Sequence, residues 1–231
     1  MHWTPPKRPV DHVEEALITA ILNGEFPPGG ALPAERELAA MLGVTRPTLR
    51  EVLRRLERDG WITIQQGKPT LVNDFWWEGG LNVISGIVRY STALPDGFVL
   101  NLLRVRLDLA PSYTREAVER DAGAVVGLLA DAPAAVAAPE RFAAYDWEVQ
   151  HRLTVLSGNP VYAMILNGFT GFYETLARKY FAPAEARRVS AAYYADLAEA
   201  ARRGNAPAAE QVTRQVMARS IALWEATNGK A

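Results

Sequence analysis

The sequence contains no cysteine and only three histidines among its 231 residues. The lack of cysteine excludes a disulfide framework, a zinc site built from thiolates and a cysteine nucleophile. No apolar run approaches the roughly 20 residues that a membrane-spanning helix needs, and the N-terminus lacks the apolar core of a signal peptide. These absences predict a soluble protein of the reducing cytoplasm.

The scarcity of histidine also argues against a metal site. The three are His2, His12 and His151, and the possible carboxylate partner of His151 on the same predicted helix is Asp146. Asp146 and His151 are five positions apart, whereas side chains on one face of a helix are three or four apart. We therefore expect no metal, and we expect His151 to be exposed or hydrogen-bonded. The sequence has no Gly-x-Ser-x-Gly elbow or comparable serine and histidine arrangement, so we do not expect an enzyme.

Neither charge sign is in excess, because the net charge is −1 and the charges are balanced even over residues 1–73. Any nucleic-acid contact should therefore be local rather than spread over a basic surface. With 49% hydrophobic residues, the chain can bury one sizeable core and one smaller core. We predict a small domain over residues 1–73, a linker over 74–79 and a larger domain over 80–231.

Residues 33–70 predict a winged helix-turn-helix. A short helix begins at Pro33, buries Leu38, Met41 and Leu42, and ends at Gly43. Thr45 is placed to cap a second helix. The apolar stripe expected along that helix comprises Leu49, Val52, Leu53 and Leu56. Two short helices in this order are typical of a helix-turn-helix.

Arginine recurs every four positions along the second helix, at Arg46, Arg50, Arg54 and Arg58. This spacing places the guanidinium groups on one side, where they can meet phosphate oxygens or guanine edges. Because the N-terminal end of such a helix enters the major groove, we expect the deepest contacts there. The predicted DNA contacts from the two helices are Arg36, Thr45, Arg46, Pro47, Thr48 and Arg50. A solvated arginine face on a small helical domain is the alternative.

A short β-hairpin is predicted over residues 61–72. Trp61 to Ile64 alternates, a turn follows, and Leu71 with Val72 forms the returning strand. At the turn, Gly67 lets the backbone approach a groove, Lys68 adds positive charge and Gln66 can hydrogen-bond in a minor groove. We predict that these three turn residues complete the DNA-binding site.

The rest of the chain is predicted to be helical. A helix over Val10 to Leu22 precedes the helix-turn-helix, and the aromatics of the linker are expected to pack rather than face water. Further helices are expected near residues 81–90, 97–120, 122–129, 139–156, 160–181, 183–203 and 206–227. The predicted fold is therefore mainly α, with an N-terminal winged helix-turn-helix domain and a C-terminal antiparallel α-helical bundle of about seven helices.

The predicted helix over residues 160–181 carries many aromatic side chains together with Gly168 and Gly171. Glycine inside a helix costs about 1 kcal/mol relative to alanine, so two of them indicate close packing or space for a guest. Leu102, Arg106 and Leu109 share one face of the helix predicted over residues 97–120. From these residues alone, a solid aromatic core and a ligand cavity both stay open.

Several short stretches resemble a known family. Those that resemble the GntR family of bacterial transcription regulators are Phe26-Pro-Pro-Gly, Leu32-Pro-Ala-Glu-Arg-Glu-Leu, Gly43-Val-Thr-Arg, Leu49-Arg-Glu-Val-Leu and Asp59-Gly-Trp. Those that resemble its FadR subfamily are Gln65-Gln-Gly-Lys-Pro-Thr, Val72-Asn-Asp-Phe-Trp, Gly80-Leu-Asn, Ser157-Gly-Asn-Pro-Val-Tyr and Ile165-Leu-Asn-Gly. The resemblance runs nearly end to end.

This resemblance implies a homodimeric regulator of fatty-acid metabolism that binds a palindromic DNA operator, acts as a repressor and in some relatives as an activator, and is released by long-chain acyl-CoA. No other cofactor is implied. The implied ligand contacts are Leu102, Arg106, Tyr173, Tyr180, Arg214, Ser220 and Trp224. A GntR-type regulator of a different small molecule, such as an organic acid, is the alternative. The chain departs from the family pattern at Pro47, Gln66, Met217 and Arg219.

Overall fold

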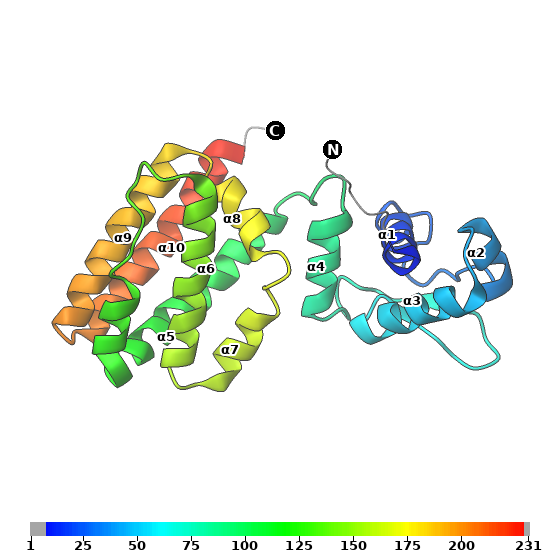
Figure 1. Cartoon of the computed structure of the whole chain (residues 1–231), viewed down its shortest axis with the longest axis horizontal. Helices are drawn as coiled ribbons and strands as arrows, with labels where there is room; N and C mark the ends of the chain where they lie inside the picture. Colours follow the sequence, from blue (N-terminus) through cyan, green and yellow to red (C-terminus); the bar gives the residue numbers. More distant parts are fainter. Residues whose placement is uncertain (1–7, 229–231) are drawn as a thin grey trace. The chain divides into compact units, whose positions relative to one another are not determined.

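The computed structural model describes residues 8–228 and divides the chain into two compact units, Met1–Leu94 and Pro95–Ala231 (Figure 1). The first unit holds α1 (Pro9–Leu22), α2 (Glu35–Met41), α3 (Arg46–Asp59), β1 (Ile62–Thr63), β2 (Leu71–Val72) and α4 (Leu81–Tyr90). The second unit holds α5 (Phe98–Leu128), α6 (Pro139–Leu156), α7 (Pro160–Asn167), α8 (Tyr173–Phe181), α9 (Ala184–Arg202) and α10 (Ala206–Asn228). The predicted mainly α fold is confirmed.

The helix-turn-helix forms as the sequence predicts. The Thr45 side chain caps α3 by accepting a hydrogen bond from the Thr48 amide at 3.4 Å, and Gly60 ends the helix in the left-handed conformation. The buried residues of α3 are the four predicted apolar ones, Leu49, Val52, Leu53 and Leu56. The expected burial of Met41 is wrong, because α2 ends there and packs through Leu38 and Ala39, which leaves Met41 65% exposed.

The predicted hairpin is present but short. β1 and β2 pair antiparallel, with Ile62 opposite Val72, and Ala31 adds a single bridge to Leu71. Residues 64–70 connect the two strands, and residues 64–69 of this connection are exposed. The hairpin therefore projects a turn from the same unit that presents α3.

Trp61 anchors α4 to the winged helix. Its fully buried ring lies 5.0 Å from the ring of Phe75, and a Cβ atom at Gly86 of α4 would come within 2.6 Å of Trp61 Cζ2. Because α4 packs in this unit, the compact division falls after Leu94, beyond the linker predicted at residues 74–79. Phe75 is buried as expected, but Trp77 is 88% exposed, so the expectation that all the linker aromatics are covered is wrong.

This close contact predicts that Gly86→Ala destabilises the first unit by about 1 to 3 kcal/mol, because the buried indole has no room for a methyl group. Urea unfolding followed by tryptophan fluorescence measures the effect. Gly127→Ala is the matched control, since a Cβ atom at that helical position meets nothing within 4 Å and should leave stability unchanged or raise it. Equal stability of the two variants would contradict the contact.

The second unit is a helical bundle in which α10 packs on α5 and α9, and α6 packs on α5 and α8. Its largest fully buried side chains are Phe142, Leu153, Phe181 and Tyr194. α5 contains a break at Asp121, whose φ of −153° is not helical and whose Oδ1 accepts a hydrogen bond from the Ala124 amide at 2.8 Å. The predicted separation between residues 120 and 122 is therefore confirmed as a kink.

The single helix predicted over residues 160–181 is wrong. The chain leaves the helix after Asn167, turns through residues 168–172 and re-enters at Tyr173. Gly168 and Gly171 both fall in this turn, so the glycines break the helix rather than lying within it. Within the described chain, the second unit is built from α5 to α10, while the helix predicted at residues 81–90 belongs to the first unit.

Candidate functional site

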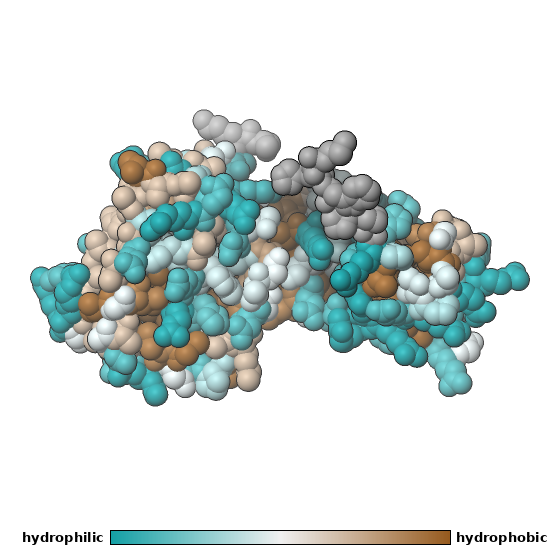
Figure 2. Space-filling model, viewed as in Figure 1, coloured by the Kyte–Doolittle hydropathy of each residue, from teal (hydrophilic) through white to brown (hydrophobic). Residues whose placement is uncertain are grey.

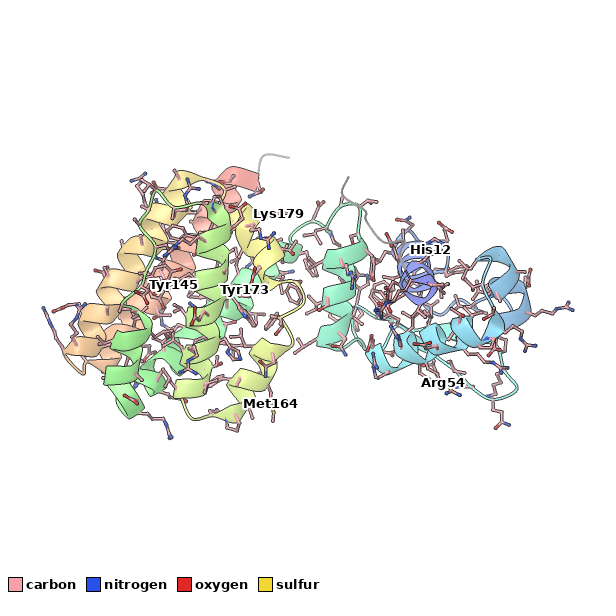
Figure 3. The ribbon with its side chains drawn as sticks, in the orientation of Figure 1. His12, Arg54, Tyr145, Met164, Tyr173 and Lys179 are labelled. Carbon is pink, nitrogen blue, oxygen red and sulfur yellow. The ribbon has the colours of Figure 1, made fainter. Side chains whose placement is uncertain are left out.

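The exposed side of α3 carries the arginine row. Leu49 and Val52 face the core of the unit, which leaves Arg46, Arg50 and Arg54 on the opposite, exposed side. Figure 3 shows Arg54 on the side of α3 that faces away from α1, and Figure 2 shows hydrophilic side chains over α3. The structure thus presents a positively charged helix face to solvent.

Glu35 at the start of α2 lies across from two of these arginines. Its Oε2 is 2.7 Å from Arg50 Nε and 3.7 Å from Arg46 Nη2. Both arginine side chains are 55% exposed and that of Glu35 is 34% exposed. Exposed ion pairs contribute at most about 1 kcal/mol, so phosphate groups can replace this carboxylate. Arg36 and Arg54 form no ion pair with another residue of the described chain.

The remaining predicted DNA-contact residues lie at the N-terminal end of α3 and in the hairpin turn. The Thr45 and Thr48 hydroxyl oxygens are 2.9 Å apart, and Pro47 is exposed beside them. In the turn, Gln66 and Lys68 are exposed, and Gly67 has a φ of +74° that other residues rarely adopt. All nine predicted residues therefore belong to the first unit and have solvent-facing or partly exposed side chains or backbone.

The second unit contains a cavity of about 100 Å³ between α5, α6, α7 and α8. Most of its wall is apolar. Its apolar lining residues are Val99, Leu102, Leu103, Val105, Leu109, Ile165, Leu166, Phe169, Phe172, Leu176, Ala177 and Phe181. Its polar lining residues are Arg106, Tyr113, Gln150, Thr154, Tyr162, Tyr173 and Tyr180. Of the two interpretations that the sequence left open, the structure therefore favours a cavity over a solid aromatic core.

The predicted ligand residues are not all at this cavity. The cavity is lined by Leu102, Arg106, Tyr173 and Tyr180. Ser220 does not line it, but its hydroxyl accepts a hydrogen bond from the Tyr180 hydroxyl at 2.9 Å. Trp224 lines a second hollow of about 40 Å³, which also borders Tyr180 and Lys179. Arg214 lines neither hollow. It lies exposed on α10 and pairs with Glu210 at 3.0 Å.

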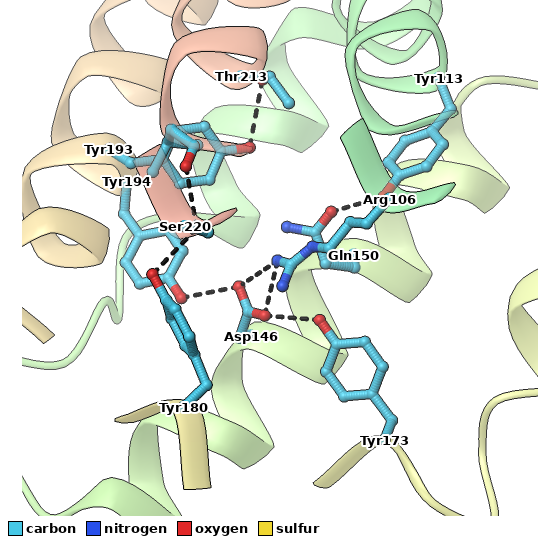
Figure 4. Close-up of polar contacts among 11 residues, drawn as sticks. Arg106, Tyr113, Asp146, Gln150, Tyr173, Tyr180, Tyr193, Tyr194, Thr213 and Ser220 are labelled. Carbon is cyan, nitrogen blue, oxygen red and sulfur yellow. Dashed lines mark hydrogen bonds and ion pairs between the residues drawn. The ribbon is translucent and has the colours of Figure 1, made fainter. Parts of the chain in front are cut away.

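The cavity-lining Arg106 belongs to a buried ion pair. Arg106 Nη2 donates to both oxygens of Asp146, at 2.7 and 3.0 Å, and the two side chains are only 19% and 3% exposed (Figure 4). Asp146 also accepts hydrogen bonds from the Tyr173 hydroxyl at 2.6 Å and the Tyr194 hydroxyl at 3.0 Å. One carboxylate thereby joins α5, α6, α8 and α9.

This arrangement fixes the protonation states of its members. Burial raises the pKa of Tyr173 and of Tyr194 well above the ordinary value, and the neighbouring Asp146 carboxylate raises both further. Burial alone would lower the pKa of Arg106, but Asp146 and the surrounding tyrosines raise it well above its ordinary value. At neutral pH the tyrosines are therefore neutral donors, and Arg106 is a cation whose charge Asp146 balances.

The sequence interpretation considered Asp146 only in relation to His151, and it did not identify Tyr194 or Gln150. The sequence does contain a signal that Asp146 has a buried partner. Asp146 interrupts an apolar stripe on α6 that contains Phe142, Val149 and Leu153. An acidic residue on an apolar helix face needs a buried partner. Which residue supplies that partner depends on how the helices pack.

The histidines have no metal-binding arrangement in the part of the chain that is described. His151 Nε2 lies 3.0 Å from Asn167 Oδ1, so His151 is hydrogen-bonded as expected, and His12 is exposed. No three histidine, aspartate or glutamate side chains of residues 8–228 gather as metal ligands would, and His2 lies outside this range. Within the same range no helix has both the length and the apolar character needed to cross a bilayer.

Family models and related sequences point to the same family of proteins. Residues 9–72 match the model described as bacterial regulatory proteins, gntR family, and residues 73–230 match the FadR C-terminal domain. A fatty acid metabolism regulator protein of Edwardsiella ictaluri is 42% identical over 216 residues, which cover 94% of this chain and 90% of that protein. A protein of the same name from Shewanella amazonensis is 43% identical over 208 residues, covering 87% and 85% of the two chains.

One solved structure is also similar in fold. It is that of Lar, described as controlling the expression of the Listeria monocytogenes agr system and mediating virulence. It has a TM-score of 0.62 at 16% identity and covers 95% of this chain and 98% of its own. At this identity the similarity shows a shared fold alone.

Proposed function

Because the chain belongs to the GntR family of bacterial regulatory proteins and carries the FadR C-terminal domain, we propose that it regulates fatty-acid metabolism genes and leaves its operator when a long-chain acyl-CoA binds. Its family makes it a DNA-binding transcription regulator rather than an enzyme. We place its action in the cytoplasm as a homodimer on a palindromic operator, since a two-fold protein matches a two-fold site.

In this proposal the N-terminal end of α3 enters the major groove. Arg46 and Arg50 exchange the Glu35 carboxylate for DNA phosphates or guanine edges, and Thr45 and Thr48 lie beside them. Arg36 approaches from α2. The hairpin turn, with Gln66, Gly67 and Lys68, follows the neighbouring minor groove, where Lys68 supplies positive charge.

The observation that carries the ligand proposal is the apolar cavity in the second unit. Its wall suits an aliphatic chain, with Leu102 on one side and Tyr173 and Tyr180 on the other. An organic-acid sensor needs an unbalanced cation for the carboxylate, but the buried cation of this cavity, Arg106, is already neutralised by Asp146. This pairing favours the acyl ligand over the organic acid.

The size of the cavity suggests how binding changes the protein. A water molecule needs roughly 10–15 Å³ of such space, so about 100 Å³ holds roughly seven to ten water-sized groups, fewer than the carbon atoms of a long acyl chain. A long acyl chain must therefore push lining side chains and helices apart. The Tyr180 side chain separates the cavity from the hollow beside Trp224 and Lys179, and its displacement would join the two. We propose that the CoA group then occupies the Trp224 side, near Ser220.

Release from DNA follows if the ligand binds the widened arrangement better than the DNA-bound one. Each tenfold loss of operator affinity requires about 1.4 kcal/mol of coupling, and DNA must weaken ligand binding by the same factor. The coupling can therefore be measured as the effect of ligand on DNA affinity or as the effect of DNA on ligand affinity.

A gel-shift titration with promoters of fatty-acid-degradation genes tests the proposal. We expect specific binding without ligand and at least about fivefold weaker binding with saturating oleoyl-CoA, since typical couplings are about 1 to 3 kcal/mol. Free CoA and a panel of small organic acids are the controls. If an organic acid releases the DNA and oleoyl-CoA does not, the alternative regulator class is correct.

A further inference from the structure

One polar side chain in the cavity wall has an unused hydrogen-bond donor. Gln150 lies on α6, is 0% exposed and lines the cavity. Its Oε1 accepts a hydrogen bond from the Tyr113 hydroxyl at 2.6 Å, which fixes the orientation of the carboxamide. The Nε2 group then has no hydrogen-bond partner among residues 8–228.

The neighbours of Gln150 do not satisfy this donor. The Tyr193 hydroxyl lies near Gln150, which lowers the pKa of Tyr193 against the larger effect of burial, but it does not satisfy the geometry of a hydrogen bond with Nε2 and lies 3.3 Å from Thr213 Oγ1. Thr154, one turn further along α6, donates its own hydrogen to the His151 carbonyl at 2.7 Å. A buried donor without a partner costs free energy, because it has lost its hydrogen bonds to water.

We propose, on the basis of the acyl ligand proposed above, that Gln150 Nε2 donates a hydrogen bond to a neutral oxygen of that ligand. Gln150 then contacts the ligand directly. Its Nε2 group recognises one oxygen of an otherwise aliphatic ligand from within a mostly apolar wall. The cavity supplies the rest of the recognition through residues such as Leu102, Phe172 and Leu176.

The charges around the cavity indicate why this oxygen is neutral. The Arg106 guanidinium is balanced by Asp146, so a carboxylate placed here would be a buried anion without a counter-ion. A carbonyl or hydroxyl oxygen accepts from an amide without that penalty. The Arg106 Nε group, which also lacks a partner in the described chain and lines the same cavity, offers a second donor on this side.

Two sources of such an oxygen fit this chemistry. One is the thioester carbonyl, which every acyl-CoA carries. The other is a hydroxyl group on the acyl chain itself, which would make the protein prefer hydroxylated chains. Both predict that removal of the Gln150 donor weakens binding, and they differ in which ligands are affected.

Calorimetric titration of the full-length protein distinguishes them, using hexadecanoyl-CoA and its 3-hydroxy and 16-hydroxy derivatives as ligands. Gln150→Leu alone would leave the Tyr113 hydroxyl without its acceptor. The comparison is therefore made between Tyr113→Phe and Tyr113→Phe/Gln150→Leu, which both lack this hydroxyl. We expect the double variant to bind at least one ligand about tenfold more weakly. Gln150→Met in the same background repeats the comparison if the leucine variant folds poorly.

The pattern across ligands identifies the oxygen. Equal weakening of all three ligands assigns it to the thioester carbonyl, and weakening of one hydroxylated ligand alone assigns it to that hydroxyl group. Unchanged or tighter binding of all three ligands overturns the role of Gln150. If acyl-CoA still releases DNA in that case, only this inference fails, whereas failure of the wild-type protein to bind any of the ligands removes the proposed function as well.

Discussion

Replacing Asp146 by alanine is expected to lower the free energy of unfolding of the second unit by about 3 to 5 kcal/mol, the usual cost of removing one partner from a buried ion pair. The substitution leaves the Arg106 guanidinium buried without a counter-ion. It also removes the acceptor of the hydroxyls of the half-buried Tyr173 and the buried Tyr194. Urea unfolding followed by circular dichroism measures the change.

Two further variants separate the buried charge from other causes. In Arg106→Met/Asp146→Leu both charges are replaced by apolar side chains, so the cost of the buried unpaired cation disappears and the double variant should be more stable than Asp146→Ala. The cost of the Tyr173 and Tyr194 hydroxyls, which still lack their acceptor, remains. Glu210→Ala removes a carboxylate that pairs with Arg115 and Arg214 at the surface, and this loss should matter far less because solvent screens those charges. A small effect of Asp146→Ala, comparable to that of Glu210→Ala, would contradict the structural role of the pair.

The DNA-binding unit was predictable because its signals are local. The N-cap at Thr45, the apolar stripe from Leu49 to Leu56 and the turn at Gly67 are each read from a few neighbouring residues. The pairing of Arg46 and Arg50 with Glu35 could not be predicted in this way, because Glu35 lies on the preceding helix, α2. Its contact depends on the angle at which α2 meets α3.

The cavity of the second unit depends on contacts that are distant in the sequence. Gly168 and Gly171 indicated space in the right part of the chain, but their turn between α7 and α8 was not foreseen, because propensity alone does not separate a helix break from an opening within a helix. Asp146 finds its partners on α5, α8 and α9, up to 48 positions away. Such a constellation becomes visible only when the packing of the bundle is known.

The exposed Glu35 has a consequence for DNA binding. In the free protein it holds Arg46 and Arg50 in place over the N-terminal part of α3, which reduces the conformational entropy that these long side chains lose on binding. In the proposed DNA complex it also competes with phosphate for the same guanidinium groups. The net effect on affinity is modest because the pairs are exposed, so the arginines themselves should dominate.

Arg46→Ala is accordingly expected to weaken specific operator binding by about 1 to 3 kcal/mol, the cost of losing one bidentate contact to guanine or a well-placed phosphate contact. Arg46 is the first residue of α3 and is half-exposed beside Thr45, where a recognition helix meets the groove. Fluorescence anisotropy with labelled operator and non-specific DNA measures the change. Arg58→Ala is the control, since Arg58 lies at the other end of α3 beside Asp59 and should leave affinity within about twofold. Equal operator affinity of wild type and Arg46→Ala would exclude this end of α3 from the DNA interface.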